Sequence, residues 1–324
     1  MRVLVTGGAG YIGSFMTDAL VKRGYEVIVL DSLERGHKES VNSKAKLIIG
    51  NIRNTQLLNE IFSSVKIDAI LHFAGLISVE ESTRNPQIYF ENNTEGSKNL
   101  FKIASENNVY NYIFSSTAAV YGNPKIIPIP EDHEKNPTSP YGESKLNTEE
   151  YLKSMRSDNQ LINFACLRYF NASGADFNGE MGEGHNPETH IIPLAIKAVM
   201  NKSSFKLFGT DYDTPDGTCL RDYIHVLDLV EAHFLALNHI LNNKGGYFYN
   251  VGTGNGVSNK KVIETVMSVS GLTTDIEACP RRAGDADRLI ADPAKIKTEL
   301  GFEAKYSDIE TIVKSAWLWH SKNG

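Results

Sequence analysis

Short apolar runs alternate with longer amphipathic segments in the first half of this chain. The runs predict β-strands at residues 2–6, 26–30, 46–49, 69–73, 112–115 and 164–168. The segments between them predict α-helices at residues 11–23, 55–63, 88–107 and 141–155. Strands that alternate with helices in this way are joined by right-handed crossovers and form a parallel sheet. The pattern therefore predicts an α/β fold with a doubly wound parallel sheet.

The pattern loosens after Asn171, where polar, glycine-rich loops separate the helices. Loops are predicted at residues 171–186 and 209–218, and helices at residues 192–200 and 227–242. Short apolar runs at residues 246–251 and 289–291 are candidate strands that return to the sheet. We therefore predict a sheet domain over residues 1–171 and a smaller substrate-binding region over residues 172–324.

Composition excludes several classes of partner. The 324 residues, of which 41% are hydrophobic and 22% charged, can bury one large core or two smaller ones. A net charge of -6 without a basic tract predicts no nucleic-acid partner. No apolar stretch approaches the roughly 18 residues of a membrane span, so no membrane partner is expected. Cys166, Cys219 and Cys279 are far apart, which is typical of a reducing compartment, and we expect a cytoplasmic protein.

A glycine-rich loop directly follows the first predicted strand. Residues 6–13 read TGGAGYIG, which matches G-x-G-x-x-G from Gly8 and opens the first predicted helix. Glycines allow a tight turn and a close approach of the backbone to a pyrophosphate, and the helix N-terminus offers free N–H groups. The loop therefore predicts a dinucleotide site of the Rossmann type.

Asp31 lies at the end of the second predicted strand. A carboxylate there accepts hydrogen bonds from the adenosine ribose hydroxyls and repels a 2′-phosphate. Asp31 therefore favours NAD over NADP, and the nearby Arg35 is the one feature that weakens this preference.

Tyr141 and Lys145 stand one helical turn apart in the sequence YGESK. A free tyrosine has a pKa of ~10, so a phenolate near neutral pH needs a downward shift of ~3 units, or ~4 kcal/mol. A nearby lysine cation in a desolvated site can supply much of this shift. Ser139 is a good N-cap and Pro140 suits the first helical position, so a helix is predicted to begin here.

The same Tyr-x-x-x-Lys spacing occurs at Tyr121 and Lys125, but the residues between them, 122–124, read as a turn that ends in proline. This second pair is therefore predicted not to share a helical face. Ser115 and Thr117 lie at the carboxyl end of a strand that is expected to face the nicotinamide. With Tyr141 they predict the oxidation of an alcohol, in which Tyr141 takes the hydroxyl proton while hydride passes to the ring.

Eight sequence blocks together resemble the extended short-chain dehydrogenase/reductase family, most closely its UDP-glucose 4-epimerases. They are residues 5–14, 72–76, 114–122, 140–145, 167–171, 216–218, 221–226 and 281–285. The resemblance implies an isomerase that interconverts UDP-glucose and UDP-galactose with NAD through a 4-keto intermediate. It also implies a homodimer.

The resemblance also implies roles for individual residues. Tyr141 would be the base, Thr117 would share its hydrogen bond to the sugar 4-OH, and Lys145 would lower the pKa of Tyr141 and hold the nicotinamide ribose. The implied cofactor contacts are Gly7, Gly10, Tyr11, Ile12, Gly13, Asp31, Ser32, Asn51, Ile52, Phe73, Ala74, Gly75, Asn92, Ser115, Tyr141, Lys145 and Phe170. The implied substrate contacts are Thr117, Tyr141, Asn171, His190, Ile191, Leu207, Phe208, Arg221, Arg282, Asp285 and Leu289.

The chain departs from the family pattern at several positions. Asn51 replaces an aspartate that contacts the adenine amine in many members, and Ile77 replaces a lysine. Thr117 stands where serine is commoner, which preserves the hydroxyl. Leu289 stands where strict UDP-glucose enzymes often have a tyrosine, and the smaller side chain leaves room for an N-acetyl group. We therefore predict some turnover of UDP-N-acetylglucosamine.

The residues after Thr117 differ from those that related reactions require. Nucleotide-sugar dehydratases usually carry Asp-Glu after the catalytic threonine, whereas this chain has Ala118 and Ala119, whose methyl groups cannot move protons. The same position disfavours a UDP-glucuronate decarboxylase. A dehydrogenase that releases NADH, an epimerase of UDP-xylose and UDP-arabinose, and a non-catalytic nucleotide sensor stay open as alternatives.

Several histidines are candidate metal ligands. His185 and His190 fall in one predicted loop, and His225 is close in sequence to Asp222 and Asp228. None of them has the spacing of a closed metal-ligand set. The sequence therefore predicts no metal site.

Overall fold

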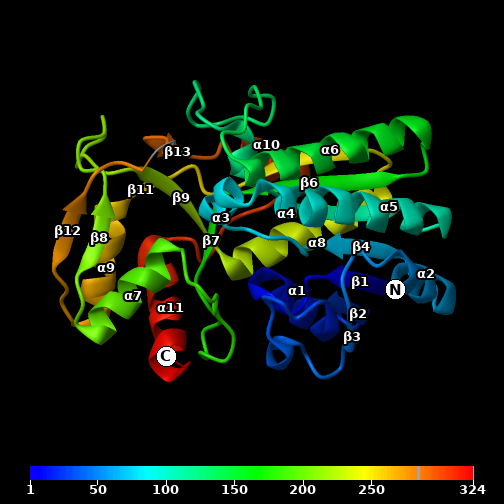
Figure 1. Cartoon of the computed structure of the whole chain (residues 1–324), viewed down its shortest axis with the longest axis horizontal. Helices are drawn as coiled ribbons and strands as arrows, with labels where there is room; N and C mark the ends of the chain where they lie inside the picture. The colour runs from blue at the N-terminus through cyan, green and yellow to red at the C-terminus, as the bar shows by residue number, and fades with distance from the viewer. Residues whose placement is uncertain (283–284, 324) are drawn as a thin grey trace. The chain divides into compact units, whose positions relative to one another are not determined.

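The computed structural model of this chain describes residues 1–282 and 285–323, which form two compact units (Figure 1). Unit 1 comprises residues 1–122, 135–168 and 230–249, and unit 2 comprises residues 123–134, 169–229 and 250 onward. The units therefore interleave along the chain, whereas the predicted division has a single boundary after residue 171. Residues 230–249 group with unit 1 because they supply a helix and a strand to it.

Unit 1 is built on a seven-stranded sheet with the strand order β10-β6-β5-β4-β1-β2-β3. The strands are β1 (Arg2–Thr6), β2 (Glu26–Asp31), β3 (Lys46–Ile49), β4 (Ala69–His72), β5 (Asn111–Thr117), β6 (Asn163–Tyr169) and β10 (Gly246–Val251). Pairing is parallel from β3 through β2, β1 and β4 to β5. The predicted doubly wound α/β fold is confirmed, and residues 246–251 return to the sheet as predicted.

Helices α2, α5 and α6 cover one face of this sheet, where Leu4, Phe101, Phe114 and Leu152 belong to one continuous apolar core. Amphipathic helices bury such a stripe against a sheet because that removes apolar surface from water. The helices of this part of the chain are α1 (Tyr11–Lys22), α2 (Thr55–Ser64), α3 (Val79–Arg84), α4 (Pro86–Tyr89), α5 (Gly96–Glu106), α6 (Pro140–Asp158) and α8 (Val226–Asn242), with short 3-10 turns at Lys38–Ser40 and Ala118–Tyr121.

The predicted single helix at residues 88–107 is wrong in one respect. A π-helical stretch, Phe90–Glu95, separates α4 from α5. The main-chain oxygen of Asn93 accepts hydrogen bonds from the hydroxyls of Ser97 and Thr148. Hydroxyl groups that bond to the backbone compete with the regular helical pattern, so the helix widens at this point.

Unit 2 has two small sheets beside a cluster of three helices, α7, α9 and α11 (Figure 1). Ile192, Ile263 and Ile312, one from each helix, share the core of this cluster. The strands are β7 (Asn171–Ser173), β8 (Phe205–Phe208), β9 (Leu220–His225), β11 (Gly256–Ser258), β12 (Ile276–Cys279) and β13 (Arg288–Leu289). The helices are α7 (Ile191–Asn201), α9 (Asn259–Ser270), α10 (Ala294–Leu300) and α11 (Ile309–Asn323).

The predicted return of residues 289–291 to the main sheet is wrong. β13 pairs in parallel with β9, so Leu289 lies opposite Arg221. Ala291 makes an isolated bridge to Ile129, which lies outside the main sheet. Over the residues that the structure describes, no helix is both long enough and apolar enough to cross a membrane.

Candidate functional site

The glycine-rich loop forms a closely packed turn between β1 and α1. Gly7 has a φ of +74°, and a Cβ atom there would lie 2.4 Å from the main-chain nitrogen of Ala74. A Cβ atom on Gly13 would lie 2.1 Å from the main-chain oxygen of Gly7. Gly10 is the N-cap of the 12-residue helix α1. Only glycine fits at Gly7 and Gly13, and the loop has the form of a backbone cradle for a pyrophosphate.

Asp31 is the last residue of β2 and contacts the glycine-rich loop. Its carboxylate is 8% exposed and accepts hydrogen bonds of 2.9 Å from the N–H groups of Ala9 and Leu33. Arg35, the one feature that weakened the preference for NAD, pairs with Glu81 at 2.8 Å. A buried carboxylate here disfavours a 2′-phosphate, and the engaged arginine offers it little compensation.

Most of the other predicted cofactor residues follow or end a strand of the main sheet, and Asn92 lies in the π-helical stretch. Phe73 follows β4, and its ring lies 4.9 Å from that of His233. Asn92 donates to Asn93 Oδ1 at 3.2 Å. The side-chain oxygen of Asn51 accepts a hydrogen bond from the N–H of Arg53 at 2.9 Å. The remaining cofactor positions in unit 1, beyond the loop and Asp31 above, are Ser32, Ile52, Ala74, Gly75 and Ser115, with Tyr141 and Lys145 described below.

Helix α6 begins where the sequence predicts. Ser139 is extended, and its hydroxyl accepts a 3.2 Å hydrogen bond from the N–H of Gly142, while Pro140 is the first helical residue. A Cβ atom on Gly142 would lie 2.6 Å from the main-chain oxygen of Ala119. The absence of a side chain therefore lets α6 approach the turn that follows β5. This approach puts Tyr141 beside Thr117.

Tyr141 and Lys145 are both held by β5. The hydroxyl of Thr117 interacts with the phenol of Tyr141 and lowers its pKa. Lys145, 3% exposed, donates to the main-chain oxygen of Ser115 at 3.0 Å and lies 5.0 Å from the ring of Phe114. The three predicted catalytic side chains are therefore brought together.

Burial changes the acid–base behaviour of both residues. It raises the pKa of Tyr141 above its ordinary value, although the hydrogen bond from Thr117 lowers it. Burial also lowers the pKa of Lys145 to about 8. The expected depression of the pKa of Tyr141 by Lys145 is not found: burial raises this pKa, Thr117 lowers it, and Lys145 is not among its causes.

Arg168 and Glu149 form a buried ion pair, which was not predicted from the sequence. Arg168 donates to both oxygens of Glu149 at 2.9 and 2.7 Å, and Ser116 donates to the same carboxylate at 2.6 Å. Arg168 also donates to the hydroxyl of Tyr121 at 2.8 Å. The network joins β5, α6 and β6. Its signal in the sequence is the polar stripe at positions 141, 145 and 149, one helical turn apart each.

Tyr121 and Lys125, which repeat the Tyr-x-x-x-Lys spacing, are not on one helix, as predicted. Tyr121 is the last residue of a 3-10 turn and is buried. Lys125 lies beyond that turn, and its side chain is 83% exposed. The two residues therefore share no helical face.

Asn93 is a second functional candidate that the sequence did not reveal. Its side chain accepts from the N–H of Leu76 at 2.8 Å and donates to the oxygen of Leu76 at 2.9 Å. It also donates to the hydroxyl of Ser144 at 3.2 Å. Asn93 therefore ties the loop after β4 to helix α6, between Tyr141 and Lys145.

The predicted substrate residues lie in unit 2, apart from Thr117 and Tyr141. The guanidinium of Arg282 lies 4.1 Å from the ring centre of Phe208. Arg221 Nη2 lies 3.8 Å from Asp285 Oδ1, and its side chain is 13% exposed. Two arginines in such positions suit a diphosphate, because a guanidinium binds phosphate oxygens bidentately. Residues 283 and 284 of the same sequence block lie outside the described residues.

The other predicted contacts in unit 2 are placed by short elements. Asn171 in β7 donates to the main-chain oxygen of Asp222 at 2.8 Å. His190 is the N-cap of α7, and its imidazole bonds to Glu183. The remaining three are Phe170, which is buried and bonds to Val251 through its main-chain N–H, Ile191, the first residue of α7, and Leu207 in β8.

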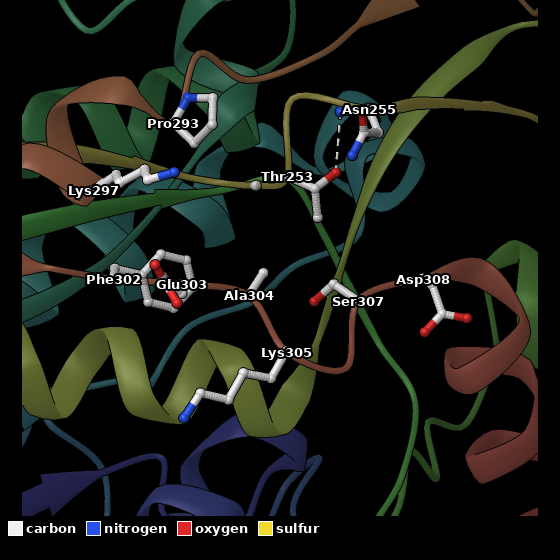
Figure 2. A pocket seen from close by; sticks show the side chains of 11 residues that line it. Thr253, Asn255, Pro293, Lys297, Phe302, Glu303, Ala304, Lys305, Ser307 and Asp308 are labelled. Carbon is white, nitrogen blue, oxygen red and sulfur yellow. Dashed lines mark hydrogen bonds between the residues drawn. The ribbon is translucent and has the colours of Figure 1, made fainter.

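Unit 2 also contains a cavity of about 480 Å³ that the sequence did not predict (Figure 2). Its lining includes Thr253, Lys297 and Lys305. Figure 2 shows the N–H of Asn255 bonded to the hydroxyl of Thr253, at 3.1 Å. None of the predicted site residues that the structure describes lines this cavity, so it is separate from the candidate site.

The chain is similar to known proteins over most of its length. A model of the NAD dependent epimerase/dehydratase family matches residues 3–252. The chain belongs to this family. The resemblance drawn from the eight sequence blocks is thereby confirmed, and the family's NAD dependence agrees with the glycine cradle and Asp31.

Individual members of the NAD dependent epimerase/dehydratase family match over the whole chain. UDP-glucose 4-epimerase of Lactobacillus helveticus is 43% identical over 325 residues, which cover 100% of this chain and 98% of that protein. The structure of UDP-glucose 4-epimerase from Bifidobacterium longum in complex with NAD⁺ and UDP is similar, with a TM-score of 0.95, 36% identity and coverage of 100% and 99%. The UDP-Glc/GlcNAc 4-epimerase of Campylobacter jejuni is similar with a TM-score of 0.87, 39% identity and coverage of 99% of each chain.

Proposed function

We propose that this chain catalyses the NAD-dependent C4 epimerisation of a UDP-sugar, interconverting UDP-glucose and UDP-galactose through a 4-keto intermediate. The observation that carries the proposal is the interaction of Tyr141, at the start of α6, with the hydroxyl of Thr117, together with the buried Lys145 one turn away. Full-length similarity to UDP-glucose 4-epimerases supports it.

The cofactor residues would hold NAD through backbone and side-chain groups. The N–H groups at the start of α1 would face the pyrophosphate, Asp31 the adenosine ribose, and Lys145 the nicotinamide ribose. When bound, NAD supplies a reversible hydride acceptor for the sugar C4. The loop can turn tightly enough for this role because Gly7 and Gly13 carry no Cβ atom that would meet the neighbouring backbone.

Tyr141 would move the proton. Its phenolic oxygen would accept the proton of the sugar 4-OH, and later return it, while the hydroxyl of Thr117 fixes the direction of this hydrogen bond. Because burial raises the pKa of Tyr141, the phenolate needs a cation nearby. Lys145, with a pKa of about 8, still carries its proton at pH 7 and would provide that charge.

The UDP group would be held by the two arginines of unit 2. Arg221 and Arg282 offer two guanidinium groups for the diphosphate, and Phe208 offers an aromatic face beside Arg282. Asn171 and Asp285 add polar groups to this set. Removal of either arginine should therefore raise KM more than it lowers kcat.

The two residues after Thr117 favour epimerisation over related reactions. Ala118 and Ala119 offer no group that can protonate or deprotonate a neighbouring carbon, as elimination of water requires. A dehydrogenase that releases NADH is the remaining alternative within the family. Purified enzyme that loses NAD during gel filtration and accumulates NADH would favour that alternative.

The range of sugars is the finer part of the proposal. Leu289 is half-buried in β13 opposite Arg221, and its side chain is smaller than the tyrosine of strict enzymes. We infer that UDP-N-acetylglucosamine is also turned over. The similarity to the Campylobacter enzyme supports this inference. UDP-xylose and UDP-arabinose remain the alternative pair, and the homodimer and cytoplasmic location remain predictions.

The test is incubation of the purified full-length protein with a panel of UDP-sugars, without added NAD, followed by separation of the C4 epimers. The proposal expects interconversion of UDP-glucose and UDP-galactose in both directions, with no net NADH. Formation of a 4-keto-6-deoxy sugar, or of a stoichiometric amount of NADH, would overturn it.

A further inference from the structure

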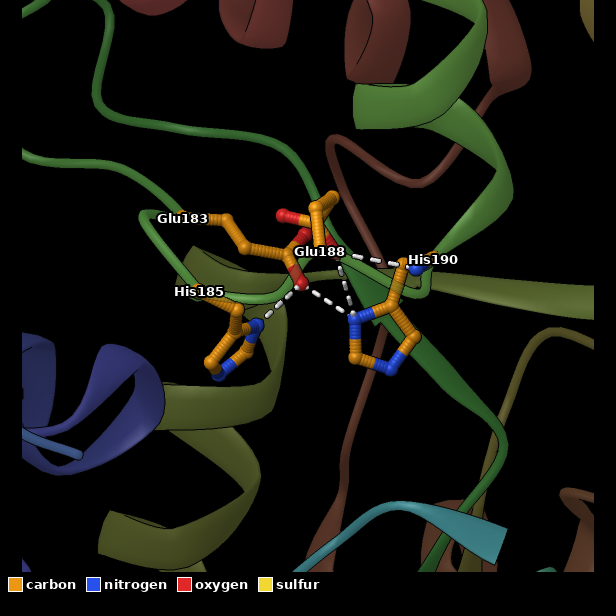
Figure 3. A group of neighbouring side chains, drawn as sticks. All are labelled: Glu183, His185, Glu188 and His190. Carbon is orange, nitrogen blue, oxygen red and sulfur yellow. Dashed lines mark hydrogen bonds and ion pairs between the residues drawn. The ribbon is translucent and has the colours of Figure 1, made fainter. Parts of the chain in front are cut away.

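Four metal-ligating side chains converge in the segment that leads into α7 (Figure 3). Glu183, His185, Glu188 and His190 each offer one ligand atom, and these atoms lie within 4.8 Å of one another. Glu183 Oε1 lies 2.9 Å from Nδ1 of His185 and is also hydrogen-bonded to Nδ1 of His190. The four side chains therefore bring one ligand atom each into a single small cluster.

One oxygen of this cluster has no partner among the described residues. Glu188 Oε1 accepts from the N–H groups of Thr189 and His190 at 2.7 and 2.9 Å. Glu188 Oε2 is buried without any hydrogen bond, and the side chain is only 3% exposed. The side chain of Glu183 is also 3% exposed, so two carboxylates are buried side by side. Such an arrangement is costly unless a cation neutralises it.

We propose that Glu183, His185, Glu188 and His190 bind a divalent first-row transition metal ion, for which Zn²⁺ is the best fit. Two imidazole nitrogens and two carboxylate oxygens make a closed four-ligand set for zinc. Ligand atoms around a tetrahedral zinc ion lie about 3.4 Å apart, so small side-chain rotations suffice. Mg²⁺ and Ca²⁺ are disfavoured because half of the ligands are nitrogen. This proposal reverses the prediction made from the sequence.

The surroundings indicate a structural role for the ion. Trp319 in α11 donates from its ring N–H to the main-chain oxygen of Glu183 at 3.1 Å. Gly182 packs so closely on the Trp319 ring that a Cβ atom would lie 2.3 Å from it. His190, which is 42% exposed, caps α7 and leaves a path for the ion from solvent. The ion would therefore hold residues 183–190 against the N-terminus of α7 and against Trp319 of α11. The proposal goes beyond the proposed reaction and does not depend on it.

An ion pair without metal is the competing description. Glu183 raises the pKa of His190 to about 9, and the two histidines lower the pKa of Glu183 to about 2. A protonated His190 could then satisfy Glu183, but Glu188 Oε2 would still lack a partner. The two descriptions differ in whether the chain takes up a metal ion.

The test uses the full-length protein after dialysis against dipicolinate. Titration with Zn²⁺ alone is followed by calorimetry, and thermal unfolding is recorded with Zn²⁺ and with Mg²⁺. We expect one zinc ion per chain, and a Tm that rises by a few degrees when Zn²⁺ exceeds Kd about 100-fold, with no rise in Mg²⁺. Glu188→Gln and His185→Asn should each weaken zinc binding at least about tenfold. His37→Asn, which changes an exposed histidine outside the cluster, is the matched control.

Three results would overturn the proposal: no zinc uptake, no rise in Tm, or equal zinc binding in both cluster variants and the control. X-ray absorption of the zinc-loaded protein gives an independent readout if a variant fails to fold. Two imidazoles among nitrogen and oxygen ligands would support the site, and a sulfur ligand or fewer than two imidazoles would contradict it.

Discussion

Lys145 donates a 3.0 Å hydrogen bond to the main-chain oxygen of Ser115, so its ammonium group is tied to the strand that carries Thr117. The lysine is 3% exposed and has no carboxylate among the causes that shift its pKa to about 8. A buried ammonium without a counter-ion destabilises the folded state. Its retention therefore indicates a functional rather than a stabilising role.

Lys145→Met should stabilise the protein freed of nucleotide by about 1–3 kcal/mol at pH 7 while abolishing epimerisation. Below pH 8 both the folded and the unfolded chain keep the lysine proton, so the full cost of burying the charge is present. Between pH 8 and about 10.5 only the unfolded chain keeps it, so the cost falls as the pH rises. Urea unfolding of both proteins at pH 7 and pH 9.5 should show the difference shrinking. A variant that is less stable at pH 7 would contradict the account.

Glu149→Gln should destabilise the fold by about 3–5 kcal/mol, because it leaves the charge of Arg168 buried without a partner. Both side chains are at most 1% exposed. Glu150→Gln is the matched control, since that residue makes only a surface pair with Lys153 and should cost less than about 1 kcal/mol. Adding Arg168→Met to Glu149→Gln should restore part of the loss. If the double variant loses as much free energy of unfolding as the two single variants together, the pair does not couple α6 to β6.

Gly142→Ala should lower kcat at least about tenfold and destabilise the fold by ~1–3 kcal/mol, because the new Cβ meets backbone. Alanine is more favourable in a helix than glycine by about 1 kcal/mol. Any loss of stability must therefore come from contacts of the new Cβ. That atom would lie 2.6 Å from the main-chain oxygen of Ala119 and push α6 away from Thr117. Glu143→Ala, which changes an exposed neighbour in the same turn, is the control. Steady-state kinetics with kcat unchanged in Gly142→Ala would contradict this close approach.

Leu289→Tyr should lower kcat/KM for UDP-N-acetylglucosamine at least about tenfold and change that for UDP-glucose less. The larger ring would occupy the space that the N-acetyl group needs. Coupled assays with both sugars over a range of concentrations give the ratio. No product from UDP-N-acetylglucosamine with the unaltered protein would refute the inferred breadth, and an unchanged ratio in the variant would refute the role of Leu289.

The sequence predicts best those features that are decided locally. The start of α6 follows from Ser139 and Pro140 because an N-cap and a first-turn proline act on their own neighbours. The cradle at Gly7 is likewise a property of a short segment, and the parallel order of the strands follows from their alternation with helices.

Features that depend on distant partners escaped prediction. Arg168 lies 19 residues from Glu149 and on a different element, so the spacing alone cannot pair them. The widening of the backbone before α5 depends on Thr148, which is 55 residues from Asn93. Glu183 and His190 lie in a loop without periodicity, so no pattern shows that their side chains converge.

Tyr141 is the residue on which the proposed mechanism depends most directly. Tyr141→Phe removes one hydroxyl from the start of α6 and keeps the ring, so the fold and NAD content should be unchanged. The epimerisation of UDP-glucose, measured by separation of the C4 epimers, should fall at least about a hundredfold, because the variant lacks the phenolic oxygen that would take the proton. If the variant folds, retains NAD and keeps near-normal activity, Tyr141 is not the base and the proposed mechanism is wrong.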